Sequence, residues 1–247
     1  MIFFKKKIIV ILGSEGRVGS SLVNHLSYDD YFIIAVDINK KRKFKKNVFQ
    51  LKIDLANEQN VKKLLLFIKK KFKKIDCVVN CIYPKNKSWG KPFEIIKKGE
   101  LNKHFSSHLT DLIIISRVFI KNFINQKKGN MIFLSSIQGL GAPKFEHYVN
   151  TKMNSCLEYS IIKAGIINMT KYLAKYYKGK NIRFNCLSIG GIKGNQSRIF
   201  KNNYKKSCLS KGLLDPDDIL SAFDFLISDK SNYINGQNII VDDGWSL

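Results

Sequence analysis

Residues 8–19 read Ile-Ile-Val-Ile-Leu-Gly-Ser-Glu-Gly-Arg-Val-Gly, an unbroken apolar run that ends in a glycine-rich turn. Such a short apolar run, bounded by glycine, is typical of a buried strand. After the turn, apolar residues return at the spacing of one helix face, at Val18, Leu22, Val23 and Leu26. A buried strand, a glycine-rich turn and an amphipathic helix in this order predict a parallel α/β sheet.

The same turn is a candidate binding site for the phosphates of a dinucleotide. Glycines let the backbone approach a pyrophosphate, and the N-terminus of the following helix offers N–H donors and the positive end of its dipole. The spacing here is Gly-x-x-Gly-x-x-Gly, and a glycine-rich turn also ends many strands for steric reasons alone. The position after a buried strand favours nucleotide binding. The residues that we expect at the phosphates are Gly13, Ser14, Gly16, Arg17, Val18 and Gly19.

A second apolar strand, over 32–36, ends at Asp37, about 20 residues after the turn. A carboxylate in this place accepts hydrogen bonds from the adenosine ribose and repels a 2′-phosphate, which favours NAD over NADP. Two other interpretations stay open. Asp37 could instead cap a following helix, and the basic segment 40–42 just beyond it could bind a 2′-phosphate.

Alternation of short apolar runs with amphipathic stretches continues along the chain. We expect further strands over 48–53, 75–79, 131–134, 182–187 and 239–241, and helices over 61–68, 109–123, 159–177 and 217–227. The segment 193–211 is polar and predicts no regular element. One doubly wound α/β domain over 1–247, a parallel sheet with helices on both faces, accounts for this pattern.

Composition excludes several classes of protein. With 45% apolar residues in 247, the chain can bury a core and is no disordered segment. The 43 Lys+Arg against 19 Asp+Glu give a net charge of +24, which would suit nucleic acid or an anionic membrane. However, only five of the basic residues are Arg, and the lysines are spread over the whole length. We therefore interpret the charge as compositional bias and expect neither nucleic acid nor membrane as partner.

The five cysteines form no Cys-x-x-Cys pair, so neither a disulfide framework nor a metal site is indicated. No apolar stretch approaches the ~20 residues of a membrane span. A reducing cytoplasmic location is the expectation from these two features.

The second half carries the more specific motifs. Ser136, Tyr159-Ser-Ile-Ile-Lys163 and Asn185-Cys-Leu-Ser-Ile-Gly190 resemble the catalytic serine, the Tyr-x-x-x-Lys pair and the Asn-x-x-x-Pro-Gly turn of the short-chain dehydrogenase/reductase family. The resemblance extends over nearly the whole chain and implies a Rossmann fold and a nicotinamide cofactor. It also implies further cofactor contacts, which are Asp54, Leu55, Asn80, Cys81, Gly190 and Ile192 beside Tyr159 and Lys163.

A second Tyr-x-x-x-Lys sequence, Tyr148-Val-Asn-Thr-Lys152, competes with the first. It lies 12 residues after Ser136, close to the family's usual separation, whereas Tyr159 lies 23 residues after it. The segment after Lys163 matches the small and apolar helix of the family, and the segment after Lys152 is polar. We therefore expect Tyr159 and Lys163 to be the functional pair, and 142–156 to be an insertion that lines the substrate mouth.

Redox chemistry between a carbonyl and an alcohol needs a general acid/base near neutrality. Lys163 follows Tyr159 by one helical turn, so its ammonium should lower a phenol pKa that starts near ~10. Ser136 would donate to the substrate oxygen, and Lys163 would also hold the nicotinamide ribose. His108 falls where the family commonly has a relay Asn; we expect a relay or a substrate contact there, titrating near neutral pH. Ile189 replaces the usual Pro before Gly190.

Within the family, segments 81–86, 138–146, 190–192 and 233–245 resemble bacterial flagellin-modification oxidoreductases, which are associated with nonulosonic sugars of the legionaminic type. This resemblance implies a phosphorylated or nucleotide-linked amino sugar as substrate, and a homodimer or homotetramer formed through the two long helices. Lysines on the loops that we expect to face the site could meet the anion or be ordinary surface residues; these are Lys85, Lys87, Lys144 and Lys193.

Two other classes of function remain open. The Gly-x-x-Gly-x-x-Gly spacing is that of sugar-nucleotide epimerases and dehydratases, which retain their NAD. A non-catalytic protein that binds nucleotide or nucleic acid could also share the fold.

Overall fold

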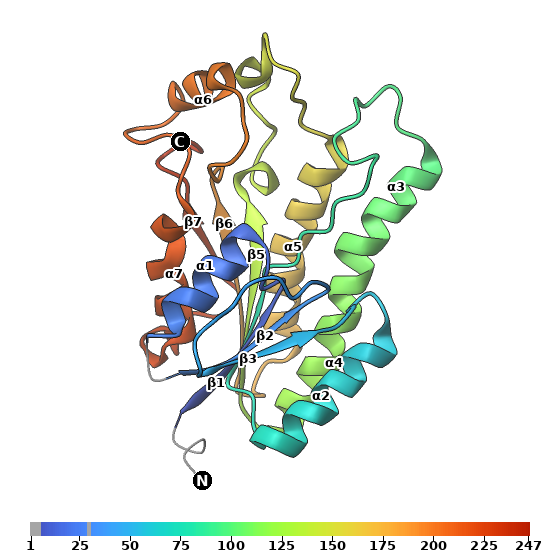
Figure 1. Cartoon of the computed structure of the whole chain (residues 1–247), viewed down its shortest axis with the longest axis vertical. Coiled ribbons are helices and arrows are strands. Elements are labelled where there is room, and N and C mark those ends of the chain that lie inside the picture. Colours follow the sequence, from blue (N-terminus) through green and yellow to red (C-terminus); the bar gives the residue numbers. More distant parts are fainter. Residues whose placement is uncertain (1–5, 29–30) are drawn as a thin grey trace.

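Seven parallel strands form one sheet in the order β3-β2-β1-β4-β5-β6-β7 (Figure 1). The computed structural model describes residues 6–28 and 31–247. The strands are β1 (Lys7–Leu12), β2 (Tyr31–Asp37), β3 (Val48–Lys52), β4 (Cys77–Asn80), β5 (Gly129–Ser136), β6 (Ile182–Ile189) and β7 (Asn238–Val241). Because the strand order reverses between β1 and β4, the carboxyl ends of these two strands open a crevice suited to a ligand.

Helices cover both faces of the sheet, as the sequence predicts. In Figure 1, α1 (Arg17–Leu26) and α7 (Leu220–Ile227) lie on one side, and α2 (Glu58–Phe72), α4 (Asp111–Gln126) and α5 (Leu157–Tyr176) lie on the other. The doubly wound, Rossmann-type α/β fold is confirmed. In the described part of the chain, every helix is too short or too polar to cross a bilayer.

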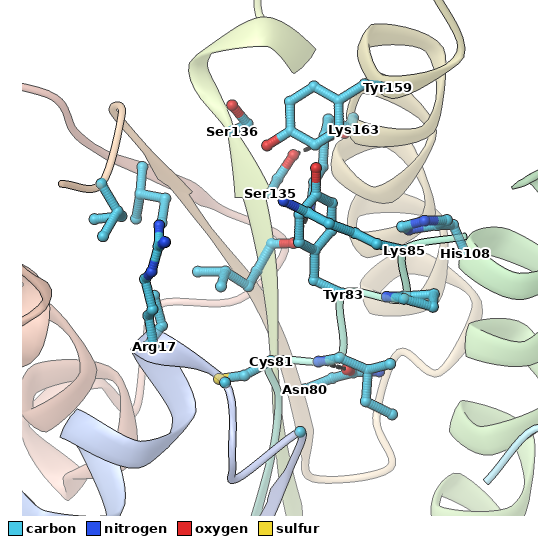
Figure 2. Close-up of a pocket in the computed structure, with 18 of the residues that line it drawn as sticks. Arg17, Asn80, Cys81, Tyr83, Lys85, His108, Ser135, Ser136, Tyr159 and Lys163 are labelled. Atoms are coloured by element: carbon cyan, nitrogen blue, oxygen red, sulfur yellow. Dashed lines mark hydrogen bonds between the residues drawn. The ribbon is translucent and has the colours of Figure 1, made fainter. Parts of the chain in front are cut away.

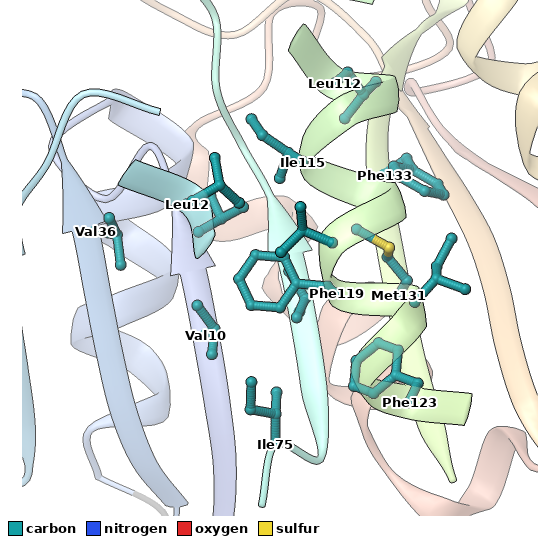
Figure 3. Packing of buried hydrophobic residues seen from close by; sticks show 14 of the residues in the cluster. Val10, Leu12, Val36, Ile75, Leu112, Ile115, Phe119, Phe123, Met131 and Phe133 are labelled. Atoms are coloured by element: carbon teal, nitrogen blue, oxygen red, sulfur yellow. The ribbon is translucent and has the colours of Figure 1, made fainter. Parts of the chain in front are cut away.

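The larger core lies between the sheet and the helices α2, α4 and α5. Figure 3 shows Phe119 and Phe123 of α4 against Val10 of β1 and Met131 of β5. Both phenyl rings are fully buried. Truncation of such a ring typically costs about 3–5 kcal/mol, so this packing fixes the sheet that presents the site.

Two parts of the chain differ from the sequence prediction. The segment 193–211 contains a helix, α6 (Arg198–Lys205), because Phe200 and Tyr204 lie one turn apart and are both buried. Before α4 the chain forms α3 (Lys98–Phe105) and a π-helical turn, Ser106–Thr110, where we expected the start of one long helix. Short 3-10 turns occupy Ile137–Gly139, Phe145–Tyr148, Pro216–Ile219 and Asp229–Ser231.

The upper end of the molecule in Figure 1 brings together segments that are far apart in sequence. The segment 142–156, α6 and the C-terminal segment lie beyond the carboxyl ends of β5, β6 and β7. His147, Phe200 and Trp245 pack together there, with ring centres 5.8–6.5 Å apart between His147 and the other two. This aromatic cover closes one end of the crevice.

Candidate active site

A cleft of about 850 Å³ runs along the carboxyl ends of the strands. One end lies at the turn after β1, and the other lies under the aromatic cover of 142–156, α6 and the C-terminal segment. The candidate residues that line it are Gly13, Gly16, Arg17, Val18, Asp37, Asp54, Leu55, Asn80, Cys81, His108, Ser136, Tyr159, Lys163, Gly190 and Ile192. The structure thus brings together all the candidates except Ser14 and Gly19.

The glycine-rich turn has the backbone geometry that brings the N-terminus of α1 to the cleft. Gly13 adopts a φ of +79°, and a Cβ built there would lie 2.8 Å from the backbone of Cys81. Both features require glycine. Gly16 is the residue before the first turn of α1, so the helix N-terminus opens into the cleft. Glycine at position 13 therefore lets the turn pack against the end of β4, and the N-terminus of α1 lies at the cleft.

Ser14 and Gly19 lie behind this turn and are not among the residues that line the cleft, so their expected contact with the phosphates stays a prediction. A Cβ on Gly19 would lie 2.1 Å from the Gly13 carbonyl oxygen, so this glycine allows α1 to pack against the turn. Ser14 is buried, and its N–H donates to the carbonyl of Val36. Both residues shape the turn from within and do not face the cleft.

Asp37 ends β2 inside the cleft, and its carboxylate is already oriented. One oxygen accepts from the N–H of Glu15 at 3.0 Å and the other from the N–H of Asn39 at 3.0 Å. No helix follows Asp37 in the described chain before α2, so the interpretation as a helix cap is wrong.

Glu15 is a cleft residue that the sequence did not single out. Its carboxylate accepts from the N–H groups of Lys41 and Arg42 at 3.2 Å each. The Arg42 guanidinium lies 3.8 Å from the same carboxylate. The carboxylates of Glu15 and Asp37 therefore both lie near the end of β2. Of the three basic residues in 40–42, Arg42 is paired with Glu15.

Further walls of the cleft are built by residues that follow the ends of β3, β4 and β6. Asp54 accepts from the N–H of Ala56 at 3.0 Å, and Leu55 beside it is buried. Asn80 accepts from the N–H of Ile82 at 2.8 Å and so shapes the turn that carries Cys81. The Gly190 N–H donates to Val241 at 2.9 Å, which fixes the loop after β6 although Ile189 replaces the proline of the family.

Ser136, Tyr159 and Lys163 meet near the middle of the cleft. Figure 2 shows Tyr159 and Lys163 reaching from α5 towards the end of β5, where Ser136 lies. Ser136 forms a side-chain hydrogen bond with Tyr159. The Lys163 ammonium donates to the Leu134 carbonyl at 2.9 Å and lies 5.6 Å from the centre of the Tyr159 ring. A serine, a phenol and a buried ammonium are thus arranged around one space.

The protonation of this trio differs from the prediction. Burial raises the pKa of Tyr159 to about 12, and the hydrogen bond with Ser136 opposes this. Burial also lowers the pKa of Lys163 to about 8. The expected lowering of the phenol pKa by Lys163 is not found in the free protein, where burial dominates and the ammonium is directed to the Leu134 carbonyl.

His108 lies in the π-helical turn and faces the cleft. Its ring stacks on Trp89 with centres 4.4 Å apart and planes 20° from parallel. Burial and the charge of Lys163 lower its pKa to about 4. The expected titration near neutral pH is therefore wrong for the free protein, in which the imidazole is neutral.

Tyr148 and Lys152, the alternative Tyr-x-x-x-Lys pair, lie in different surroundings in the structure. Tyr148 ends a 3-10 turn and lines the cleft, where its hydroxyl accepts from Gln138 at 3.2 Å. Lys152 is exposed and lies outside any helix. The segment 142–156 does line the mouth, through Pro143, Lys144, His147, Tyr148 and Met153.

Of the four loop lysines, Lys85 and Lys144 line the cleft, whereas Lys87 and Lys193 do not. Lys193 pairs with Asp215 at 2.8 Å instead. Sequence reasoning missed several lining residues besides Glu15, which are Tyr83, Gln138, Gln196, Tyr204 and Trp245. Tyr83, Gln138 and Trp245 lie in segments that carry the family resemblance, but no motif gave these residues a role of their own.

The arrangement of cleft and trio is that of an oxidoreductase with a nicotinamide cofactor, and comparisons with known proteins agree. A family model described as enoyl-(acyl carrier protein) reductase matches residues 18–246. Post-translational flagellin modification protein A of Campylobacter coli is 40% identical, over 98% of this chain and 99% of that protein. A 7α-hydroxysteroid dehydrogenase of Bacteroides fragilis is 27% identical, over 99% of this chain and 96% of the relative.

Solved structures give the same result. A short-chain dehydrogenase of Leptospira borgpetersenii with bound NAD⁺ superposes with a TM-score of 0.90 at 29% identity, covering 98% of this chain and 93% of the other. A 4-hydroxyisoleucine dehydrogenase complexed with NADH superposes with a TM-score of 0.81 at 25% identity, covering 98% and 99%. The chain belongs to the short-chain dehydrogenase/reductase family, as its motifs predicted, and is a nicotinamide-dependent oxidoreductase.

Proposed function

We propose that this protein transfers hydride between NAD and a sugar-derived alcohol or carbonyl, in the synthesis of a surface-glycan sugar such as the nonulosonic, legionaminic-type sugars that modify flagellin. The observation that carries the redox step is the meeting of Ser136, Tyr159 and Lys163 in one cleft. The 40% identity to a flagellin modification protein supports the sugar pathway. A phosphorylated or nucleotide-linked sugar is the substrate class that we propose.

The chain's own groups suit proton transfer to a carbonyl oxygen. With its pKa raised to about 12, the Tyr159 phenol holds its proton at neutral pH and can donate it. Ser136, hydrogen-bonded with Tyr159, is placed to hold the same oxygen. Lys163 contributes positive charge and would bind the ribose of the cofactor. A nicotinamide bound in this cleft would supply or accept the hydride, and its oxidised ring would add a positive charge that favours the phenolate form of Tyr159.

The carboxylates at the end of β2 support NAD over NADP. Glu15 and Asp37 would both face a 2′-phosphate, and Arg42 is engaged by Glu15. We expect calorimetric titration to give NAD at least about tenfold tighter binding than NADP, since about 1.4 kcal/mol of like-charge repulsion suffices for that ratio. Replacement of both carboxylates, by Glu15→Gln and Asp37→Asn, should reduce the ratio. Equal affinities in the unaltered protein would contradict the proposal.

The redox function is tested by mixing the protein with NAD or NADH and a panel of sugar phosphates and nucleotide-linked sugars, in both directions. We expect net change in NADH absorbance with at least one of them. Tightly bound NAD without net turnover would favour an epimerase or dehydratase instead. Strongly salt-dependent DNA binding without NAD binding would favour a nucleic-acid-binding protein.

We also propose a homodimer or homotetramer formed through α4 and α5. Both helices expose large apolar side chains, which are Ile113 and Ile124 on α4 and Leu157, Ile161, Tyr172 and Tyr176 on α5. Light scattering coupled to gel filtration should give two or four chains per particle. A monomer at micromolar concentration would contradict this.

A further inference from the structure

A buried polar cluster joins three segments of the chain next to the reacting trio. His104, in the last turn of α3, and Glu158, in the first turn of α5, are both fully buried. The Nδ1 atom of His104 lies 2.8 Å from the Glu158 carboxylate. Its Nε2 atom lies 2.9 Å from Asn86 Oδ1, in the loop of residues 81–97 between β4 and α3. One imidazole therefore ties α3 and α5 to this β4–α3 loop.

The contacts of Asn86 fix a proton on His104 Nε2. The Ser88 N–H donates to Asn86 Oδ1 at 3.0 Å, and the Ser88 hydroxyl donates to it at 2.9 Å. An atom that accepts from a backbone N–H is the amide oxygen, so it can only accept from the imidazole as well. The Ser88 oxygen, 3.0 Å from Nε2, accepts too, because its own proton points to Asn86. A further proton lies between Nδ1 and Glu158, since two bare acceptors at this distance would repel each other.

Stability alone gives little reason for a buried pair of this kind. The cost of taking two charges out of water is about as large as the attraction between them, and apolar side chains of similar volume often stabilise a fold equally well. Loss of one partner, in contrast, leaves an unpaired polar group in the interior. A buried pair can therefore specify one arrangement of the segments that it joins.

The segment that Glu158 holds is the turn that carries the phenol. Glu158 directly precedes Tyr159 in the first turn of α5. Helix ends open more readily than helix middles. The N-cap residue of α5 is Cys156, whose thiol is a weaker acceptor than the oxygen side chains that usually cap a helix. The bond to His104 therefore supplies a fastening that the cap gives only weakly.

The β4–α3 loop supplies the wall against the Tyr159 ring. The centre of this ring lies 5.8 Å from that of Tyr83 and 6.1 Å from that of Trp89. The Trp89 indole N–H donates to the Tyr83 hydroxyl at 2.9 Å, which joins the two rings of the wall. The ring of His104 lies 5.0 Å from that of Trp89. His104 thus contacts both the turn that carries the phenol and the wall beside it.

We propose that His104 and Glu158 are a positioning pair for Tyr159, which hold the phenol where it transfers its proton by fastening the first turn of α5 to the β4–α3 loop. Neither member of the pair is among the residues that line the cleft, whereas Tyr159 is. The pair therefore acts through Tyr159 and exchanges no proton with the substrate. This inference rests on the proposed redox function, in which Tyr159 is the proton donor.

The effect of the pair on the Tyr159 ring can be tested without any substrate. Glu158→Gln keeps the size of the side chain and removes its charge. Glu100→Gln is the matched control, because Glu100 pairs with Lys91 at 2.7 Å and joins α3 to the same loop without contacting α5. In protein labelled with ¹³C-tyrosine, we expect Glu158→Gln to shift the Tyr159 ring signals, assigned with Tyr159→Phe, and Glu100→Gln to leave them unchanged. Equal responses in the two variants, or none in either, would overturn the inference.

Kinetics then test whether the pair acts through Tyr159. Glu158→Gln should lower kcat by about tenfold, because a small misplacement of a reacting group has an effect of at least this order, and should leave KM and the calorimetric affinity for NAD nearly unchanged. In a Tyr159→Phe background the same change should have no further effect, since the group that the pair positions is gone. Glu100→Gln should leave kcat unchanged in both backgrounds. A loss from Glu158→Gln that persists without the phenol would contradict the positioning role.

The two readouts keep this inference apart from the redox proposal. Tyr159 signals that respond to Glu158→Gln, in a protein that turns over no sugar of the panel, would contradict the proposed substrate class and still support the pair. Turnover of a sugar with a kcat that Glu158→Gln does not change would leave the oxidoreductase intact and remove the positioning pair.

Discussion

Two Tyr-x-x-x-Lys segments lie 11 residues apart in this chain, and the fold treats them differently. Tyr159 and Lys163 share a turn of α5, and Lys163 is buried with its ammonium on the end of β5. Tyr148 also reaches the cleft, but its 3-10 turn ends there and Lys152 is left in solvent. Spacing alone favours Tyr148; the helix is what puts a phenol and an ammonium side by side.

The largest expected difference in kcat/KM is the one between variants of the two tyrosines. Tyr159→Phe removes the proposed proton donor and should lower kcat/KM by about 10³-fold, within the usual range for a general acid. Tyr148→Phe, its matched control, removes one hydrogen bond from Gln138 and should change kcat/KM less than about tenfold. Steady-state NADH oxidation, with the carbonyl substrate found in the panel, measures both. The reverse order of effects would assign the chemistry to Tyr148.

The lysines should give the next largest difference. Lys163→Met should lower kcat/KM by about 10²-fold, because it removes both the charge beside Tyr159 and the proposed ligand of the cofactor ribose. It should also weaken NAD binding in a calorimetric titration. Lys152→Met alters only an exposed side chain and should leave both quantities unchanged. A comparable loss in the two variants would remove the distinction between the segments.

Stability against pH gives a smaller difference that needs no substrate. Burial lowers the pKa of Lys163 from 10.5 to about 8, so between these pH values the unfolded chain binds more protons than the folded one. The free energy of unfolding therefore rises with pH in this window, by about 2 kcal/mol for this group between pH 8 and 10.

Urea denaturation at pH 8 and pH 10 measures this contribution. The rise in the free energy of unfolding should be smaller by that amount in Lys163→Met than in Lys152→Met. The buried cysteines and Tyr159 have raised pKa values, which make the free energy of unfolding fall above pH 9. Their contribution is the same in both variants, so the comparison cancels it. Identical changes in the two variants would show that burial does not lower the pKa of Lys163.

Much of the fold could be predicted because parallel strands covered on both faces are continuous apolar runs. Ile8 to Leu12 and the glycine turn after it are such local signals, and the structure has β1 there. Helix α6 was missed because two buried aromatic residues, Phe200 and Tyr204, are its sole apolar anchor within a polar segment.

The sequence predicted which residues form the site better than it predicted their protonation states. Ser136, Tyr159 and Lys163 could be placed together by their motifs. Glu15 could not, since its partners Lys41 and Arg42 lie on another loop. The raised pKa of Tyr159 and the lowered pKa of His108 depend on burial, which follows from packing and not from spacing.

The most direct test of the assignment is a crystal structure of the complex with NAD⁺. The quantities to measure are the distances from the nicotinamide C4 atom to the two tyrosine hydroxyls, and from the ribose hydroxyls to the two lysine ammonium groups. We expect Tyr159 to be the nearer phenol and Lys163 to be within hydrogen-bond distance of the ribose. A nicotinamide ring beside Tyr148, with Lys163 still bound to the Leu134 carbonyl and out of reach of the ribose, would contradict the assignment.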